Sequence, residues 1–136
     1  MYFIDKRCVV EKSIYFVMKI LLIEKNATVR FTVTRILIKE GYEVVSADNG
    51  SQAFELIQSQ KFDVILTNIF LKYYSGFEII HLAKQSALNK DAKVIVISDA
   101  FTSDIIKRLC DMEVDDIISK PFLPMELMYR LSKLFD

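Results

Sequence analysis

The sequence predicts one α/β domain, a doubly wound (βα)5 arrangement in which helices cover both faces of a five-stranded parallel sheet. The chain has 136 residues, which suits a single domain, and it is 52% hydrophobic with only three glycines and two prolines. Short runs rich in Val, Ile and Leu alternate along it with amphipathic runs of about 10 to 15 residues. Such alternation is typical of a parallel sheet buried between helices.

Five short segments have the composition of β-strands. Three of them carry at least three consecutive Val, Ile or Leu residues, as a strand buried on both faces requires. Parallel neighbours need a crossover connection, so a helix is expected after each strand. The predicted strands cover residues 19–24, 43–47, 63–67, 93–98 and 114–119.

Helix signals lie where this arrangement needs them. Polar N-caps, a proline near a first helical position and a glycine after a last turn mark the ends of helices. In the fourth helix, Ile105, Ile106 and Leu109 are expected to face inward. The end signals are, in chain order, Asn26 as a cap, Gly41 as an end, the turn 48–50, Gly76 before the third helix, Thr102 or Ser103 as a cap, and Pro124 opening the last helix.

Composition and cysteine usage exclude several classes of protein. The 18 basic and 18 acidic residues cancel, which argues against nucleic-acid binding driven by electrostatics. The longest apolar tract, within residues 14–23, is about half of the ~20 residues that span a bilayer, so no membrane association is expected. Cys8 and Cys110 form no disulfide framework and no zinc motif, which indicates a cytoplasmic protein with reduced, mostly buried thiols.

Parallel doubly wound sheets place their sites at the carboxyl ends of the strands. The residues at these ends are mostly polar or charged. Because these ends meet at one edge of the sheet, their side chains are expected to form one pocket. They are Glu24 and Lys25, Asp48, Asn68, Ser98 and Asp99, and Lys120 with Pro121.

Together these positions resemble the receiver domain of two-component response regulators, of the chemotaxis-regulator type. The resemblance covers residues 18–136 and implies the flavodoxin-like strand order 2-1-3-4-5. Several pieces in register carry it, and no single one is decisive. They are Lys120-Pro121-Phe122 after the fifth strand, Ser98 ending the fourth, residues 40–45 (EGYEVV) and the turn 48–50 (DNG).

The resemblance implies a particular phosphoryl-transfer chemistry. In that family the first strand ends in two acidic residues, and the third ends in an aspartate that accepts a phosphoryl group from a histidine kinase. Mg²⁺ bridges these carboxylates, because a hard dication prefers oxygen ligands. A hydroxyl residue on the fourth strand and a lysine after the fifth contact the phosphoryl group and neutralise its charge.

This chain departs from the family at the positions that matter most for that chemistry. The acidic pair is Glu24 and Lys25, and the acceptor position is Asn68, whose amide cannot form an acyl phosphate; Ser98 and Lys120 do match. The formal charges of Glu24, Lys25 and Asn68, at the three positions where the family has carboxylates, cancel, which gives a dication little reason to bind. We therefore expect no metal, no cofactor and no enzymatic activity.

The loop after the acceptor position departs as well. Lys72 stands where the family usually has proline, and Ser75 stands where an acidic residue precedes the glycine. Ile117 occupies the position of the family's switch aromatic. Tyr73 and Tyr74 either form part of a partner-binding surface or pack over the pocket.

Two further alternatives stay open from the sequence. Lys25 either takes the place of the metal, bridging Glu24 and the amide oxygen of Asn68, or points to solvent. Asp99 is either a surface carboxylate or an unconventional phosphoryl acceptor. A flavin or nucleotide carrier of the same topology is disfavoured because the loop 24–28 lacks the glycine that a phosphate-cradling loop requires.

The family usually meets its partners through its fourth helix, fifth strand and fifth helix. By position this surface corresponds to Lys107, Ile117, Met128 and Tyr129. The partners implied are a histidine kinase, another regulator or an output protein, and a second copy of the chain is a further alternative. An isoleucine in place of the switch aromatic suggests a fixed surface.

Residues 1–17 lie outside the resemblance and form an N-terminal extension, interpreted as mobile or as an extra edge element.

The sequence predicts that residues 18–136 form a receiver-like signalling module of a two-component pathway that acts through protein–protein interaction. Asn68 and Lys25 predict that it is not phosphorylated in the usual way. The alternative is a working phosphorelay receiver that uses an acceptor such as Asp99. The chain is expected either to stand alone or to be a piece of a longer regulator.

Overall fold

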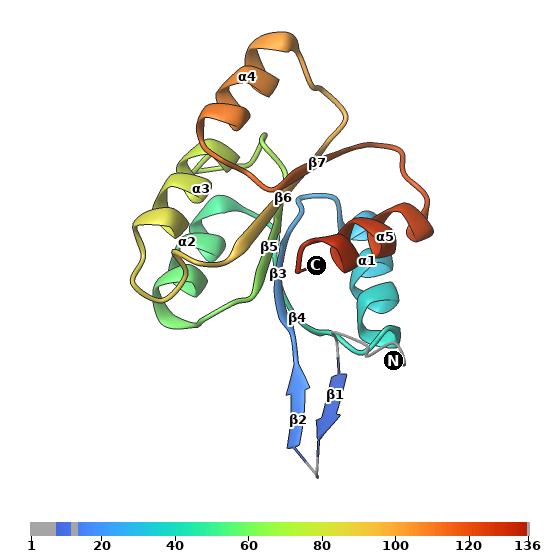
Figure 1. Ribbon diagram of the computed structural model, residues 1–136. Coiled ribbons are helices and arrows are strands. Elements are labelled where there is room, and N and C mark those ends of the chain that lie inside the picture. The colour runs from blue at the N-terminus through green and yellow to red at the C-terminus, as the bar shows by residue number, and fades with distance from the viewer. Residues whose placement is uncertain (1–7, 12–13, 136) are drawn as a thin grey trace.

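The computed structural model describes residues 8–11 and 14–135, which include a five-stranded parallel sheet. Its strand order is β4-β3-β5-β6-β7, which is the predicted order 2-1-3-4-5 when the five strands are numbered along the chain (Figure 1). The predicted fold class is therefore confirmed. The strands are β3 (Lys19–Ile23), β4 (Glu43–Ala47), β5 (Val64–Thr67), β6 (Lys93–Ser98) and β7 (Asp116–Ser119).

Five helices connect and follow these strands and form the two outer layers. Helices α1 and α5 lie on one side of the sheet, and α2, α3 and α4 lie on the other (Figure 1). Each side has its own core cluster, so the sheet is covered on both faces. The helices are α1 (Ala27–Lys39), α2 (Gly50–Ser59), α3 (Gly76–Gln85), α4 (Ser103–Asp111) and α5 (Pro124–Lys133).

The alternation of side chains along the central strands explains the two clusters. On β3, Leu21 and Ile23 belong to the cluster beneath α2 and α3, whereas Ile20 and Leu22 belong to the cluster beneath α1 and α5. Successive residues of a strand point to opposite faces, so an uninterrupted apolar run fills both cores. This is the physical reason for the consecutive Val, Ile and Leu residues in the sequence.

The helix starts follow their capping side chains. Asn26 accepts a hydrogen bond from the backbone of α1, and Thr102 does the same for α4. Ser75 and Glu78 form a reciprocal capping box at α3, which makes Gly76 the first residue of that helix rather than the residue before it. Pro124 occupies the first turn of α5, where its missing N–H leaves no intrahelical bond unmade.

Two sequence predictions about α4 are wrong. Ile106 is 38% exposed, whereas Ile105 is half-buried and Leu109 is buried. Ile105 and Leu109 are four residues apart and share one stripe of the helix, and Ile106 lies about 100° farther round it. Cys110 is exposed and free, so its thiol is not part of the core.

The residues before the sheet form a separate element. Strands β1 (Cys8–Glu11) and β2 (Ile14–Val17) pair antiparallel in a two-stranded sheet of their own, and the hairpin projects from the end of the domain (Figure 1). The predictions for residues 1–7 lie outside the described residues. Within the described ranges, no helix has the length and apolar character needed to cross a bilayer.

Candidate functional site

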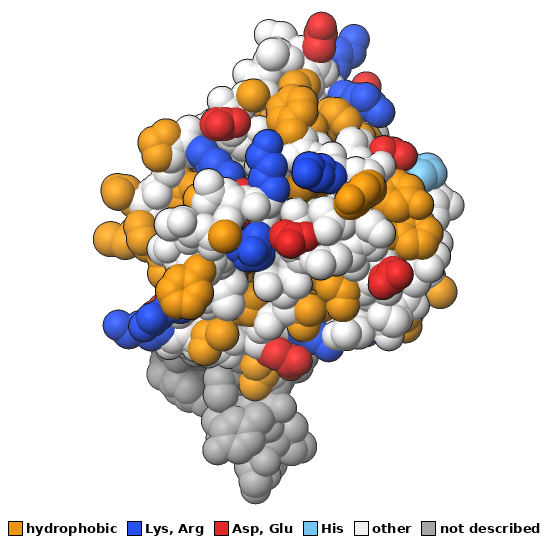
Figure 2. All heavy atoms as spheres, turned by 180° about the vertical axis from the view of Figure 1, so that it is seen from behind, with side chains coloured by type: hydrophobic (Ala, Val, Ile, Leu, Met, Phe, Trp, Pro, Cys, Tyr) orange, Lys and Arg blue, Asp and Glu red, His pale blue; other side chains and the backbone are white. Residues whose placement is uncertain are grey.

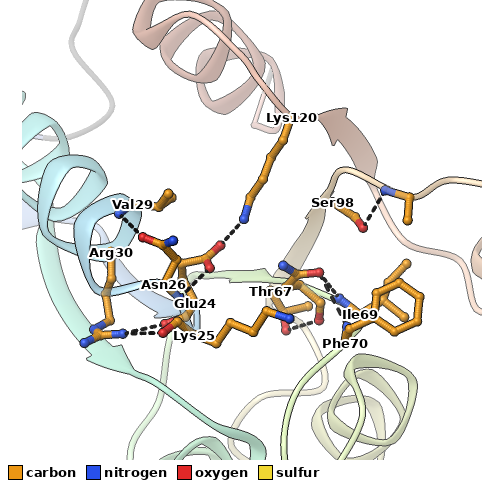
Figure 3. A network of polar contacts seen from close by, with 12 residues as sticks. Glu24, Lys25, Asn26, Val29, Arg30, Thr67, Ile69, Phe70, Ser98 and Lys120 are labelled. Carbon is orange, nitrogen blue, oxygen red and sulfur yellow. Dashed lines mark hydrogen bonds and ion pairs between the residues drawn. The ribbon is translucent and has the colours of Figure 1, made fainter.

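The carboxyl ends of β3, β5, β6 and β7 bring together several of the residues that the sequence singled out (Figure 3). Ile23 of β3 is in register with Thr67 of β5, so the residues that follow them, Glu24 and Asn68, leave neighbouring strands at the same edge. In the same way Ser98 ends β6 beside β7, and Lys120 follows β7 directly. Strand order and register alone therefore bring these residues together.

Glu24 is the buried carboxylate of this site. Only 3% of the residue is exposed, and its Oε1 atom lies 2.5 Å from Nζ of Lys120. The second oxygen, Oε2, accepts the backbone N–H of Asn26 at 2.9 Å. Both oxygens are thus occupied by donors, and the charge of the carboxylate is balanced by the lysine across the sheet.

Asn68 lies in the acceptor position at the end of β5 and is 5% exposed. Its backbone N–H donates to the carbonyl of Ile23 at 3.3 Å, which ties it to β3. Its side-chain Oδ1 accepts the backbone N–H of Ile69 at 2.7 Å and, at the longer distance of 3.4 Å, that of Phe70. The amide oxygen therefore organises the start of the β5–α3 loop.

Ser98 is fully buried at the end of β6. Its Oγ accepts the backbone N–H of Ala100 at 3.2 Å, and its carbonyl accepts the backbone N–H of Lys120 at 2.9 Å. The hydroxyl thus contacts the loop that follows β6, and the backbone of Ser98 holds the start of the β7–α5 connection. The Lys120–Pro121 peptide bond that opens this connection is cis.

Lys25 follows Glu24 but is exposed. Among the described residues, the ion pair of Glu24 is made by Lys120 rather than by Lys25. The side chain of Lys25 lines a surface pocket together with the β5–α3 loop. Of the two interpretations, the bridge from Lys25 to Glu24 and Asn68 is therefore not the arrangement that the structure has.

Arg30 is a site residue that sequence reasoning missed. Its Nη1 donates to the carbonyl of Glu24 at 2.7 Å and to that of Lys25 at 3.4 Å, so it holds the β3–α1 loop from within the first turns of α1 (Figure 3). A basic side chain one turn after an N-cap is the only signal in the sequence for this role. From the sequence alone, Arg30 cannot be distinguished from an ordinary exposed arginine.

The two loop tyrosines differ in environment. Tyr74 is half-buried and stacks on Phe54 of α2, with ring centroids 5.0 Å apart and an interplanar angle of 15°. Tyr73 is 77% exposed and has a φ of 73°, in the left-handed region that a non-glycine residue rarely adopts. Tyr74 therefore packs against α2, and Tyr73 presents its ring to solvent.

The surface formed by α4, β7 and α5 includes the four residues assigned to it from the sequence. Lys107 is exposed, Tyr129 is 61% exposed, and Ile117 and Met128 are half-buried against the two cores. Ile117 therefore has its side chain partly in the core beneath α2, α3 and α4. The surface combines aromatic, aliphatic and basic groups.

An ion pair between β7 and α5 supports this surface. Nη1 of Arg130 donates to both carboxylate oxygens of Asp116, at 2.8 and 3.0 Å. The hydrogen bond with Asp116, and then its charge, raise the pKa of Arg130 above its ordinary value. The guanidinium therefore stays protonated beside Asp116 at neutral pH. Sequence reasoning did not single out this pair.

The residues of the site do not suit a divalent cation. Within the described part of the chain, no three His, Cys, Asp or Glu side chains gather as a metal centre requires. Glu24 is the buried carboxylate, and both of its oxygens already accept hydrogen bonds. Lys120 places an ammonium group beside it, and Asn68 offers a neutral amide whose oxygen is used by the following loop.

Asp99 does not join this cluster of contacts. It is exposed and lines a cavity of about 520 Å³ between α1 and the β7–α5 connection, whose lining also includes Lys120 and Phe122. Lys120 thus contacts Glu24 through its ammonium group and also lines this cavity.

Comparisons with known proteins agree with this fold. The sequence model of the family described as response regulator receiver domain matches residues 20–132 of this chain. The chain is 33% identical over 112 residues to the phosphate regulon transcriptional regulatory protein PhoB of Pseudomonas aeruginosa, covering 82% of this chain and 49% of that protein. It is 30% identical over 117 residues to the response regulator receiver protein CpdR of Brucella abortus, covering 85% and 95%.

Solved structures show the same architecture. The chemotaxis response regulator CheY4 of Vibrio cholerae superposes with a TM-score of 0.81 at 23% identity, covering 87% of this chain and 98% of that one. The chain is also 32% identical over 117 residues to a probable transcriptional regulator, ycf29, of Pyropia yezoensis, covering 85% of this chain and 52% of that protein. It therefore spans about half the length of ycf29 and of PhoB. The chain belongs to the response regulator receiver domain family.

Proposed function

We propose that this receiver domain signals through protein–protein contacts without phosphorylation at the position of the acceptor. The observation that carries the proposal is the state of Asn68, a neutral amide whose Oδ1 accepts the N–H of Ile69 at 2.7 Å. An amide nitrogen is a poor nucleophile, and the amide oxygen is already used within the protein. A carboxylate would be needed to form an acyl phosphate at this point.

The contacts of Lys120 support the same proposal. In the family the lysine of this motif pairs with the phosphoryl group, whereas here its ammonium group is 2.5 Å from Glu24 without one. The pair links β3 to the connection that leads into α5. A site whose charges are satisfied by its own side chains has little need of an incoming phosphoryl group or Mg²⁺.

A solved relative gives the contrast. A response regulator of Burkholderia pseudomallei, 25% identical and with a TM-score of 0.76, has been solved with a phosphorylated aspartic acid and a calcium ion. This chain has Asn68 where the family motif has its acceptor aspartate and Lys25 where the motif has an acidic residue. Both changes remove negative charge that a cation would bind.

The surface of α4, β7 and α5 is the contact face that we assign to partners. Tyr129 is exposed, Lys107 adds a positive charge, and Met128 and Ile117 supply apolar contact area. Such mixed surfaces with aromatic residues are typical of specific protein contacts. The partners we propose are a histidine kinase, another regulator or an output protein of a two-component pathway.

The test is a titration of the ¹⁵N-labelled full chain with Mg²⁺ and beryllofluoride, a mimic of the phosphoryl group. We expect no saturable shifts of the backbone amides of Asn68, Ser98 and Lys120. The matched variant Lys25→Asp/Asn68→Asp restores both carboxylates and is expected to give saturable shifts at the same amides. Saturable shifts in the unchanged protein would refute the proposal.

A second candidate is a phosphorelay receiver that uses Asp99. The observation in its favour is that Asp99 and Lys120 line the same cavity of about 520 Å³, so a carboxylate and a potential phosphoryl partner border one space. Incubation with acetyl phosphate and Mg²⁺ followed by mass measurement separates the two candidates. A phosphoryl adduct that disappears in Asp99→Asn would establish this second function in place of the first.

A further inference from the structure

A pocket of about 390 Å³ lies between the β3–α1 loop and the β5–α3 loop. Two lysines, Lys25 and Lys72, line it together with Phe70, Phe77 and the aliphatic residues of the second loop. In Figure 3 the side chain of Lys25 runs from the β3–α1 loop toward the end of β5. The pocket is thus built by the two segments in which this chain departs most from the motifs of its family.

The charged side chains that line this pocket are both lysines. Neither Lys25 nor Lys72 makes an ion pair within the ranges that the structure describes. The neighbouring carboxylates are engaged elsewhere, because Glu24 is buried against Lys120 and Glu78 accepts the N–H of Ser75 at 3.0 Å in the capping box. Two free ammonium groups in one concave site favour an anionic partner.

The loop that carries Lys72 is held in place before any partner binds. The carbonyl of Lys72 accepts the N–H of Gly50 at 3.0 Å, and the carbonyl of Ile69 accepts the N–H of Gly76 at 2.7 Å. The stacking of Tyr74 on Phe54 adds a third anchor on α2. A preorganised loop loses little conformational entropy on binding, so even a small contact contributes to affinity.

The lining indicates which kind of anion the pocket suits. Phe70 is 49% exposed and borders the two lysines, and Tyr73 presents its exposed ring from the same loop. An inorganic anion would leave this apolar area in water, whereas a peptide segment can cover it while its carboxylates meet the lysines. The surface therefore matches an acidic segment that also carries an apolar side chain.

We propose that this lysine pocket, formed by Lys25, Lys72 and the loop 69–75, binds an acidic segment of a protein partner. Carboxylates of the segment pair with the two ammonium groups, and an apolar side chain packs on Phe70. The inference rests on the proposed function, since a receiver that signals without a phosphoryl group needs a contact site that is always formed. Lys25, which stands where the family has a cation-binding carboxylate, would then contact an anionic partner here.

The experiment is a titration of the ¹⁵N-labelled full chain, without Mg²⁺ or any phosphoryl mimic, with an acetylated and amidated Glu-Phe-Glu peptide. We expect saturable amide shifts in residues 69–75 and at Lys25. The same peptide with glutamine in place of glutamate is expected to shift them little. The variant Lys25→Glu/Lys72→Glu is expected to weaken binding at least about tenfold, which is the effect of one strong charge contact.

The matched control is Lys61→Glu/Lys90→Glu, which makes the same change of charge at two exposed lysines outside the pocket. It is expected to bind the acidic peptide as the unchanged chain does. An equal loss in this control, equal shifts with the glutamine peptide, or absence of shifts with either peptide would overturn the inference. Equal binding of inorganic phosphate at the same amides would identify a small-anion site and overturn it as well.

The two proposals fail in different experiments. Beryllofluoride shifts at Asn68 would refute the unphosphorylated receiver and leave the peptide result unaffected. Conversely, failure of the peptide to bind removes the acidic partner and leaves the chemistry of Asn68 as argued.

Discussion

At the scale of single residues, the site is governed by how its few charges are satisfied. The Glu24 side chain is 4% exposed and that of Lys120 is 18% exposed, so the pair lies largely out of water. A buried charge that loses its partner keeps the full cost of its desolvation. The pair is therefore a structural contact of the domain as well as a feature of its site.

Removing either partner is expected to destabilise the fold. Glu24→Gln keeps an acceptor for the N–H of Asn26 but removes the charge, and we expect a loss of about 1–3 kcal/mol in the free energy of unfolding. Lys120→Met leaves Glu24 charged and unpaired, and we expect a larger loss. Urea denaturation followed by circular dichroism measures both. Lys25→Met, at an exposed position, serves as the control and should change the free energy of unfolding by less than about 0.5 kcal/mol. Equal losses for all three variants would contradict a structural role of the Glu24–Lys120 pair.

Asn89 shows how a structural residue can be hidden in the sequence. It is 1% exposed and accepts the N–H of Phe62 at 2.7 Å, and it donates to the carbonyls of Ile57 and Gln60 at 2.7 and 2.8 Å. It thereby ties the end of α2 to the segment before β6. An asparagine between two helical patterns predicts only a turn or a cap, because its partners are some 30 residues away.

At the scale of secondary-structure elements, local sequence signals located most boundaries correctly. Strands β4 and β6 begin and end where predicted, and Asn26 and Thr102 cap their helices as expected. The errors have a common origin. Which side of α4 is buried depends on how the helix lies against the sheet, and this is not encoded in the spacing of apolar residues alone.

Gly76 links the start of α3 to the site. A Cβ atom at this position would overlap the carbonyl oxygen of Asn68 and would lie 2.7 Å from Cα of Ile69. We expect Gly76→Ala to lower the free energy of unfolding by about 1–3 kcal/mol, since backbone atoms cannot yield as a flexible side chain can. Thermal and urea denaturation measure the loss, and amide shifts should appear at Asn68 and Ile69.

The control for this change is Ser51→Ala, in the exposed first turn of α2. It is expected to change stability by less than about 0.5 kcal/mol. If Gly76→Ala were as stable as the unchanged protein, the close approach of α3 to the end of β5 would not constrain the domain.

At the scale of the whole molecule, the receiver domain and the N-terminal hairpin are separate elements. The two described core clusters are formed by residues from Met18 onward, and β1 and β2 pair only with each other among the described strands. Figure 2, which shows the domain from behind, has apolar side chains interspersed with charges of both signs over this face. Charges of both signs are therefore mixed over this face.

A chain that begins at Met18 is expected to fold as the full chain does. Its free energy of unfolding should differ by less than about 0.5 kcal/mol, because every described member of the two core clusters lies at Met18 or beyond. Urea denaturation and the amide spectrum of residues 18–135 provide the measurement. A loss of cooperativity, or a drop in stability of several kcal/mol, would mean that the hairpin is part of the folding unit.

The sequence by itself determined the class of fold and the residues at the carboxyl ends of the strands, and its resemblance to the receiver family implied the strand order. It could do so because apolar runs, caps and parallel connections are local signals, and strand ends follow from them. Only the tertiary structure decided which lysine pairs with Glu24, that Tyr74 packs on α2 while Tyr73 is exposed, and that Lys25 and Lys72 share a pocket. These pairings join residues from different elements, and the distance and angle between such elements arise from packing.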